Sequence, residues 1–249
     1  TEFDFEILKT RLREQAFLNA GIHIQISDER DPDHIICENF CYEGGISSFV
    51  EYLNKKKAVE LVHPDIIHFS TVADDDQATA EVAMQYNDSY NELILSFANN
   101  IHTTDGGTHE EGFKRSLTRV MNDYARKYNL LKDSDKNLTG DDVREGLTVV
   151  ISIKVKDAQF EGQTKAKLGN TEISGLVSNM MNDKLSTYLE ENPATARAIF
   201  DKALAASRAR EAARKAKDMV RRKSALESAA LPGKLADCQS KNPEESELY

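Results

Sequence analysis

Hydrophobic residues recur along the chain at two spacings, which predict helices and strands respectively. Apolar residues return every three to four positions, the spacing of one helical face, in residues 4–19, 46–57, 109–128, 171–190 and 193–228. Apolar residues alternate with polar ones or run together in residues 21–27, 66–73, 78–86, 92–99 and 146–155. The first of these strands is predicted to form a hairpin with the segment that ends at Gly44-Gly45.

The order of these elements predicts an α+β fold, with helices packed on a mostly antiparallel sheet. The three strand-like runs between residues 66 and 99 follow one another closely, so they are expected to lie antiparallel and adjacent. The last helix would be roughly 50 Å long at about 1.5 Å per residue. That length exceeds what packing on a small sheet requires.

The charge of this acidic chain is unevenly distributed. The whole sequence has a net charge of -10, yet residues 193–225 contain ten Lys or Arg against three Asp or Glu. One face of this last helix is apolar and mostly alanine, so it is expected to lie close against a partner surface: Ile199, Ala203, Ala206, Ala209, Ala213, Ala216 and Val220. A second stripe is basic, flanked by Arg208: Arg210, Arg214, Lys217 and Arg221.

This basic stripe has two interpretations. A charged helical face is usually only solvated, but a long stripe of one sign repels itself unless a partner neutralises it. The phosphates of a DNA duplex would do so. Since no groove-reading motif accompanies the stripe, such binding would be independent of base sequence.

Several classes of protein are excluded or disfavoured by what the sequence contains. It has no run of 18 apolar residues and no basic-then-apolar start, so neither a membrane span nor a signal peptide is expected. The chain begins without Met, inside a helical pattern, as a piece of a longer protein would. Cys37, Cys41 and Cys238 are expected to be free thiols in a reducing cytoplasm. We find no nucleotide-binding P-loop, no nucleophile elbow and no metal-ligand cluster, and hence no complete active site.

The segment FEGQTKAKLGN, residues 160–170, is the candidate for chemistry. It places Gln163, Thr164 and Lys165 on a turn bounded by Gly162 and Gly169. An amide, a hydroxyl, a cation and backbone N–H groups are the donors that a bound phosphate requires. A solvated surface loop is the other interpretation. Because no complete site is present, a phosphate bound here would belong to an active site completed by another part of the protein.

A second glycine-rich segment precedes the helix predicted over 109–128. Gly106-Gly107 permits a tight turn, and Thr108 with Glu111 forms a capping-box pattern, so Thr108 is expected to cap this helix. His109 has no partner that its spacing identifies, so a structural role is expected for it.

Several longer motifs resemble the B subunit of bacterial DNA gyrase. They occur in the same order over essentially the whole chain: YEGGISSFVEYLN, NNIHTTDGGTHEEGF, DDVREGLTVVISIKV, QFEGQTKAKLGN, ENPATARAIF, AREAARKAKD and LPGKLADC. The B-type subunit of topoisomerase IV shares GGTH and the Q-T-K loop, and it remains the alternative. The first and the last of these motifs are more similar to gyrase.

The resemblance implies a division of the chain into three parts. Residues 1–45 would be the C-terminal end of a GHKL-type ATPase domain. Residues 46–225 would be the transducer domain, with a ribosomal-protein-type left-handed β-α-β fold. Residues 226–249 would be a linker that approaches the TOPRIM domain, where metal ions assist DNA cleavage.

The resemblance also implies site residues, cofactors and partners. Gln163 and Lys165 match the family's contacts to the γ-phosphate of ATP, and Lys114 stands where the family often has an Arg that could contact DNA. ATP and Mg2+ would serve the full-length protein, an ATP-dependent type II topoisomerase of the bacterial nucleoid, with no stable binding by this chain alone. The expected partners are duplex DNA, a second copy of the B subunit and the gyrase A subunit in an A2B2 complex. Because the base, the magnesium ligand and the DNA-cleaving residues lie elsewhere, the chain alone is expected to be inactive.

Two other classes stay open beside this one. The chain could be a DNA-binding module that acts without ATP, or a scaffold whose last helix is a dimerisation arm. Salt-dependent binding of duplex DNA would favour the first, and a mass that depends on concentration without DNA affinity would favour the second.

Overall fold

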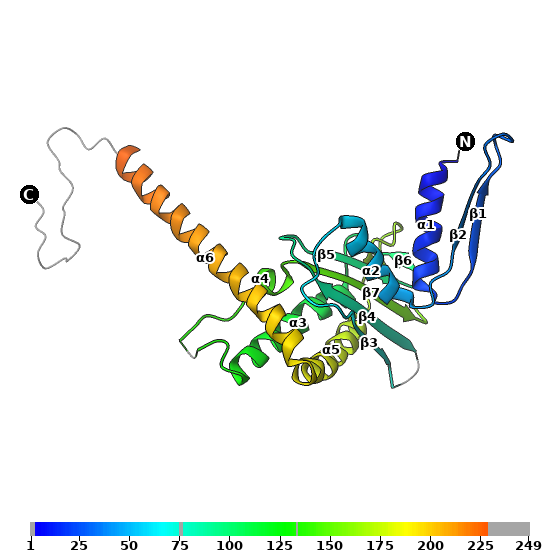
Figure 1. Ribbon diagram of the computed structural model, residues 1–249. Helices are drawn as coiled ribbons and strands as arrows, with labels where there is room; N and C mark the ends of the chain where they lie inside the picture. The colour runs from blue at the N-terminus through cyan, green and yellow to red at the C-terminus, as the bar shows by residue number, and fades with distance from the viewer. Residues whose placement is uncertain (1–2, 75–76, 133, 229–249) are drawn as a thin grey trace, which may run out of the picture. The chain divides into compact units, whose positions relative to one another are not determined.

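The computed structural model describes residues 3–74, 77–132 and 134–228, with side chains described as far as residue 220. The helices are α1 (Phe5–Leu18), α2 (Gly45–Lys57), α3 (Thr108–Lys127), α4 (Gly140–Arg144), α5 (Thr171–Glu191) and α6 (Pro193–Ser228). The strands are β1 (Ile24–Asp28), β2 (Ile36–Phe40), β3 (Ile67–Val72), β4 (Ala78–Tyr86), β5 (Leu93–Ala98), β6 (Ile101–His102), β7 (Leu147–Val155), β8 (Phe160–Glu161) and β9 (Lys167–Leu168). The described residues divide into two units, one that ends at Ala206 and one that begins at Ser207, so that α6, drawn in Figure 1, belongs to both.

The first unit has a five-stranded sheet with the order β3-β4-β7-β5-β6. All neighbouring strands are antiparallel except β5 and β7, which are parallel. The mixed α+β class with a mostly antiparallel sheet is therefore confirmed. The expectation that β3, β4 and β5 lie side by side was wrong for β5, because the chain crosses over through α3 and α4 and inserts β7 between β4 and β5. A parallel pair requires a crossover of this kind.

Strand β7 is the centre of the unit, because both of its faces are buried. Val149, Ile151 and Ile153 belong to the core under one face of the sheet, whereas Val150 belongs to a second core on the opposite face. Alternate residues of a strand point to opposite faces, so a strand covered on both sides has the continuous apolar run seen in LTVVISIKV.

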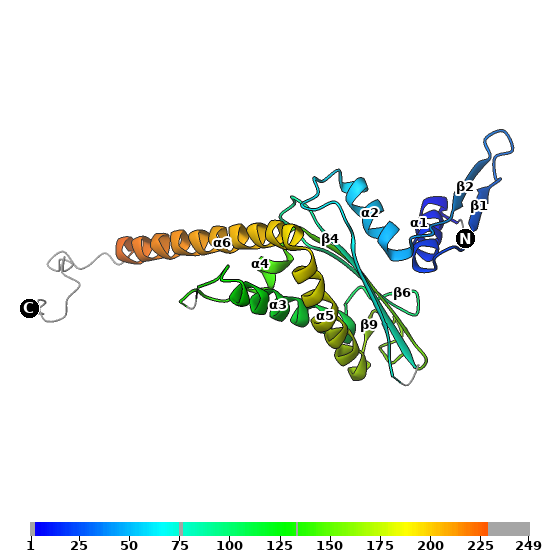
Figure 2. The same ribbon diagram turned by 60° about the horizontal axis from the view of Figure 1, so that its bottom comes forward.

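The larger core lies between the sheet and helices α3, α5 and the first turns of α6. Phe113, Leu117 and Met121 of α3 are buried there together with Phe200 of α6, whose ring stacks on Tyr124 with the ring centroids 5.1 Å apart. Figure 2 shows α3 and α5 on one side of the sheet and α1 and α2 on the other. The predicted apolar stripe of α3 is thus confirmed as its core-facing side.

The second core joins α1 and α2 to the opposite face of the sheet. The ring of Phe17 stacks on Phe49 of α2 with centroids 4.6 Å apart, and both side chains are buried with Phe97 of β5. Gln15 of α1 also donates from Nε2 to the carbonyl of Asn100, in the β5–β6 turn, over 3.0 Å. The segment before residue 46 therefore packs into the same unit as the sheet.

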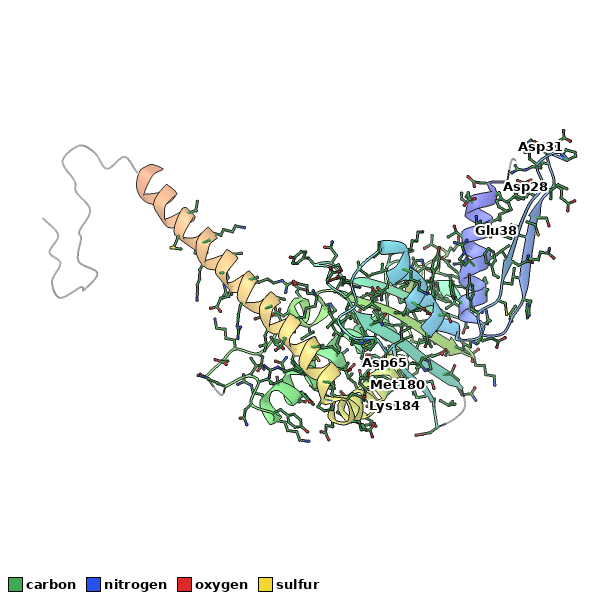
Figure 3. All side chains as sticks on the ribbon, viewed as in Figure 1. Asp28, Asp31, Glu38, Asp65, Met180 and Lys184 are labelled. Carbon is green, nitrogen blue, oxygen red and sulfur yellow. The ribbon has the colours of Figure 1, made fainter. Side chains whose placement is uncertain are left out.

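Two contacts at the periphery of this unit join its outer elements, one at the β1–β2 hairpin and one at strand β3. Lys9 of α1 forms an ion pair of 2.6 Å with Glu38 of the β1–β2 hairpin, in the region labelled in Figure 3. On the other side, Lys184 of α5 donates to the carbonyl of Ser70 over 2.5 Å. Ser70 lies in β3, an edge strand, so the lysine occupies a carbonyl that no neighbouring strand pairs.

The structure also adds elements that the hydrophobic pattern did not indicate. The short helix α4 lies outside the residue ranges in which the hydrophobic pattern predicts a helix or strand, and it begins with a capping box between Thr139 and Asp142. Strands β6, β8 and β9 are two residues long, too short for periodicity to reveal. Cys37 and Cys41 are free thiols, as expected, and Cys238 lies outside the described residues. Within the described residues, none of the helices is both long and apolar enough to cross a membrane.

Two helical glycines give a matched test of the packing between α3 and α5. A Cβ at Gly112 of α3 would lie 2.7 Å from the backbone oxygen of Ser174, whereas a Cβ at Gly175 of α5 would meet nothing within 4 Å. Gly112→Ala should therefore lower the free energy of unfolding by about 1–3 kcal/mol through overpacking. Gly175→Ala should raise it by about 0.5–1 kcal/mol through its higher helix propensity. Urea denaturation of both variants measures the difference, and equal shifts would contradict the close approach of the two helices.

Candidate functional site

The segment 160–170 forms a short hairpin between β8 and β9. Phe160 pairs with Leu168 and Glu161 with Lys167, and the tip closes with a 3.4 Å bond from the N–H of Lys165 to the carbonyl of Gly162. Gly162 and Lys165 both have positive φ, 77° and 54°. Glycine adopts that conformation freely, whereas a lysine does so only when the surrounding turn imposes it.

The tip of this hairpin presents its polar groups to solvent. Gln163, Thr164 and Lys165 are all exposed. The Lys165 ammonium lies 5.9 Å from the centre of the Phe160 ring. Among the described residues no carboxylate pairs with Lys165, whereas Lys167 forms an ion pair of 3.1 Å with Glu161. The hairpin therefore offers one amide, one hydroxyl and one uncompensated cation side by side, a donor set that fits a phosphate group.

The base of the hairpin is bonded to the glycine turn that precedes α3. The N–H of Asp105 donates to the carbonyl of Ala166 over 2.9 Å, and the N–H of Leu168 donates to the carbonyl of Gly106 over 3.2 Å. Gly107 has a φ of 139°, and a Cβ there would lie only 2.5 Å from the backbone oxygen of Leu168. Two segments far apart in the sequence are thus in direct backbone contact.

This contact also decides where α3 begins. The expectation that Thr108 caps the helix was wrong: α3 starts at Thr108 itself, its N-cap is Gly107, and no side chain caps it. The hydroxyl of Thr108 is buried without a hydrogen-bond partner. Because Gly107 must pack on Leu168, the helix starts one residue earlier than it would with a capping box at Thr108.

A chain of polar contacts runs from the start of α3 into the sheet. His109 Nε2 lies 3.1 Å from the hydroxyl of Thr103, which lies 2.9 Å from the hydroxyl of Ser96. Ser96 donates to Glu110 Oε2 over 2.8 Å, and Glu110 Oε1 accepts from Lys114 Nζ over 2.6 Å. Lys114 is therefore connected to the strand beneath it and, through the start of α3, to the base of the hairpin.

His109 is fully buried in this chain of contacts. Burial lowers its pKa from 6.5 to about 4, because the imidazolium would lose its hydration, while the nearby Glu110 opposes the shift. Its Nδ1 is buried without a hydrogen-bond partner and its Nε2 contacts the hydroxyl of Thr103, so among the described residues no carboxylate is hydrogen-bonded to the imidazole. A structural role for His109 agrees with this geometry.

The second unit, from Ser207 onward, holds the whole predicted basic stripe. The side chains of Arg208, Arg214 and Lys217 are exposed and that of Arg210 is half-buried, while the side chain of Arg221 lies outside the described residues. The apolar, mostly alanine face of α6 is buried in its first part and exposed in its second. Ile199, Ala203 and Ala206 are buried in the first unit, but the four stripe positions of the second unit are exposed: Ala209, Ala213, Ala216 and Val220.

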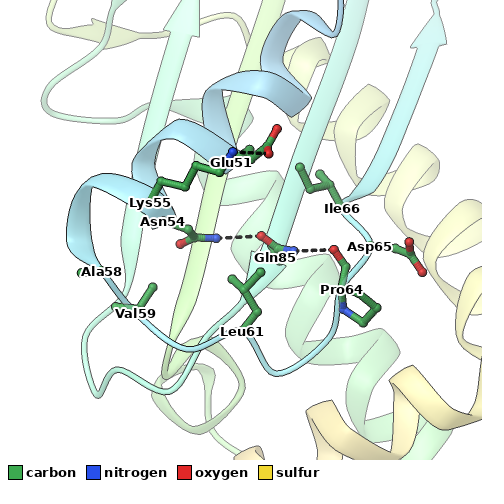
Figure 4. Close-up of a pocket in the computed structure, with 10 residues that line it drawn as sticks. All are labelled: Glu51, Asn54, Lys55, Ala58, Val59, Leu61, Pro64, Asp65, Ile66 and Gln85. Atoms are coloured by element: carbon green, nitrogen blue, oxygen red, sulfur yellow. Dashed lines mark hydrogen bonds and ion pairs between the residues drawn. The ribbon is translucent and has the colours of Figure 1, made fainter.

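A surface cavity of about 400 Å³ lies elsewhere, between α2 and the segment that leads to β3 (Figure 4). Its amide groups are already bonded to one another or to the backbone. Asn54 Nδ2 donates to Gln85 Oε1 over 2.8 Å, and Gln85 Nε2 donates to the carbonyl of Pro64 over 3.0 Å. Glu51 and Lys55 at its rim form an ion pair of 2.6 Å. These hydrogen bonds hold α2 to the sheet, and they leave few polar atoms of the cavity available to a ligand.

The structure brings some of the predicted site residues together. Gln163 and Lys165 share the tip of one hairpin, and Lys114 lies in the same unit, linked to the base of that hairpin. No sequence pattern predicted that Glu110 and Ser96 connect Lys114 to the sheet. This connection follows only from the contact between α3 and β5. In the described part of the chain, three or more His, Cys, Asp or Glu side chains nowhere gather into a group that could hold a metal ion.

Two solved structures have similar folds. The 43K ATPase domain of Thermus thermophilus gyrase B, in complex with an aminocoumarin, matches 88% of this chain and 57% of its own with a TM-score of 0.76 and 38% identity. The topoisomerase IV ATP binding domain of Francisella tularensis, in complex with a small molecule inhibitor, matches 84% of this chain and 54% of its own with a TM-score of 0.66 and 26% identity.

Sequence comparison is more specific. The family model for DNA gyrase B matches residues 45–219. The DNA gyrase B protein of Clostridium acetobutylicum is 58% identical over the whole chain, and that of Halalkalibacterium halodurans is 54% identical. The chain belongs to the DNA gyrase B family, and it spans 38% of the length of these two relatives.

The buried histidine makes the stability of the chain depend on pH. His109 has a lower pKa when folded than when unfolded, so the unfolded state binds more protons below pH 6.5 and stability is lost as the pH falls toward 4. This residue alone accounts for about 3 kcal/mol over that range. Urea denaturation between pH 7 and 4 should show a shallower loss for His109→Gln than for the wild type. Identical slopes would contradict the burial of a neutral imidazole.

Proposed function

We propose that the chain is the transducer region of a DNA gyrase B protein, which senses the γ-phosphate of ATP and passes that signal toward DNA. One observation carries the proposal: the exposed hairpin tip with Gln163 and Lys165 is bonded through its base to the start of α3. Membership of the gyrase B family supports the same assignment.

Lys165 is the group best suited to distinguish ATP from ADP. Its ammonium is exposed and has no carboxylate partner among the described residues, so a γ-phosphate would be its first strong anionic ligand. Gln163 would add a neutral donor from the same tip. Binding would restrain the hairpin, and the backbone bonds at Asp105 and Leu168 would pass this restraint to α3.

The division of the chain follows from this role. We assign residues 1–45 to the C-terminal end of the ATPase domain, residues 46–225 to a transducer domain of the left-handed β-α-β type, and residues 226–249 to the approach to the TOPRIM domain. The contacts of α1 with α2 and the sheet support a rigid connection between the first two parts.

The cofactors and partners belong to the full-length protein. ATP supplies the free energy through binding and hydrolysis. The residue that acts as catalytic base and the residues that bind Mg2+ lie outside this chain. The proposed partners are a DNA duplex, a second copy of the B subunit and the gyrase A subunit, in a type II topoisomerase that closes a DNA gate, passes one duplex through another and introduces negative supercoils. The chain alone should hydrolyse no ATP and cleave no DNA.

The basic stripe supports contact with the transported duplex. Arg214 and Lys217 are exposed on the second unit, and Arg210 and Arg221 share their face of the helix by sequence; Arg208, which flanks the stripe, is exposed as well. A DNA-binding module without ATP coupling is the second candidate that this stripe favours. A topoisomerase IV protein is an alternative by fold, although the two relatives above, at 58% and 54% identity, are gyrase proteins.

The first test concerns the hairpin tip. Lys165→Ala in the full-length protein should reduce ATP turnover at least about tenfold, because a charge-assisted contact to a partly buried phosphate contributes roughly 1.5–3 kcal/mol. Gln163→Ala should reduce it less, since a neutral donor is lost. Lys167→Ala is the matched control, because this lysine is already paired with Glu161. Normal turnover in the Lys165 variant would remove the sensing role.

The second test concerns the stripe. Duplex binding should weaken steeply with salt, with a slope of about -0.9 for each phosphate contacted. Replacing Arg210 and Arg214 by Ala should flatten this slope equally for unrelated DNA sequences. Replacing Arg197 and Lys127, which pair with Asp201 and Glu190, should leave it unchanged. An unaltered slope in the first variant would make the stripe a solvated face.

A further inference from the structure

We propose that Glu110 is a positioning residue that masks the charge of Lys114 and releases it when the nucleotide-sensing hairpin moves. The proposal rests on the function proposed above and adds a regulatory contact to it. In this arrangement Lys114 is not a constant DNA contact. Its availability to a phosphate depends on the state of the hairpin.

The ion pair between Glu110 and Lys114 is partly buried and is supported by a further hydrogen bond. Lys114 Nζ and Glu110 Oε1 are 2.6 Å apart, with the two side chains only 33% and 18% exposed. The other carboxylate oxygen of Glu110 accepts from Ser96, a buried residue of β5, over 2.8 Å. Each oxygen of the carboxylate therefore has its own partner, one on the sheet and one on α3, and the ammonium is held where its charge is neutralised.

A second ion pair shows what an ordinary contact of this spacing looks like. Glu51 and Lys55 of α2 have the same four-residue separation and the same distance of 2.6 Å. Their side chains are 54% and 75% exposed, and the hydrogen bond from Lys55 is the only one from a side chain to Glu51 within the described residues. Such an exposed pair contributes little and is easily exchanged for water. Burial and the bond to Ser96 distinguish the pair at Glu110.

The same carboxylate also touches the turn that holds the hairpin. A Cβ at Gly106 would lie 3.1 Å from Glu110 Oε2, so the backbone of Gly106 borders the carboxylate directly. On its other side Gly106 accepts the N–H of Leu168 from the hairpin over 3.2 Å. A displacement of the hairpin base therefore carries Gly106 and the first turn of α3 with it, and it shifts Glu110 relative to Ser96 of β5.

The consequence is a switch made of three connected parts. The hairpin tip would respond to a phosphate, the backbone contact between Leu168 and Gly106 would carry the displacement, and Glu110 would convert it into a change in the charge that Lys114 presents. Before the displacement the cation is neutralised. After it, the cation is available to a phosphate of the duplex.

The test is duplex binding by the full-length protein in complex with its gyrase A partner, with and without a non-hydrolysable ATP analogue. Glu110→Gln keeps the shape of the side chain and its contact with Ser96 but removes the charge. Without nucleotide, this variant should bind duplex about three- to fivefold more tightly, the effect of one additional phosphate contact. Its salt dependence should be steeper by about 0.9, which a merely structural role would not produce. The analogue should then increase its affinity less than it does for the wild type.

Two further variants make the result specific. Glu51→Gln removes the same charge from the matched exposed pair and should leave duplex affinity and salt slope unchanged. The double variant Glu110→Gln with Lys114→Gln should lose the gain of Glu110→Gln. A cooperative melt at the wild-type temperature verifies that each variant is folded.

Three results would overturn the proposal: unchanged binding by Glu110→Gln, the same gain from Glu51→Gln, or a gain that survives in the double variant. These results are distinct from failure of the proposed function. If Lys165→Ala reduces ATP turnover while Glu110→Gln binds as the wild type does, only the masking of Lys114 is wrong. If Lys165→Ala turns over normally while Glu110→Gln gains affinity through Lys114, masking stands and nucleotide sensing by the hairpin is wrong.

Discussion

The backbone contact between Gly107 and Leu168 is the constraint on which the proposed mechanism depends. A side chain at position 107 would enter the space of the Leu168 peptide, and the φ of 139° at Gly107 is one that other residues rarely adopt. The contact fixes the start of α3 and holds the base of the hairpin at the same point. Movement of one element is consequently difficult without movement of the other.

Strand β7 extends this coupling through the first unit. Its two buried faces belong to two cores, one with α3, α5 and α6 and the other with α1 and α2. Closely packed interiors transmit displacement because they deform little. A displacement of the hairpin base would therefore be passed to both α3 and the segment before residue 46, while the hairpin tip is exposed to solvent.

The helices and long strands could be predicted from the sequence because their periodicity extends over many residues. The stripe with Phe113 and Leu117 marked α3, and the run in β7 marked a strand. The order of the strands could not be predicted this way, since the parallel pairing of β5 with β7 arises from a crossover rather than from local pattern. Family motifs predict phosphate contacts at Gln163 and Lys165, and these stay predictions, whereas Glu110 emerged only from its contact with Ser96 across the fold.

Amide hydrogen exchange of this chain tests the central claim most directly, because it reports local opening of individual backbone bonds. If the hairpin base and the start of α3 form one rigid element, the amides of Asp105 and Leu168 should exchange slowly and at similar rates. The amides of Gln163 and Thr164 at the exposed tip should exchange quickly. Exchange at Asp105 and Leu168 as fast as at the tip would show that the two segments open independently, and it would contradict the account.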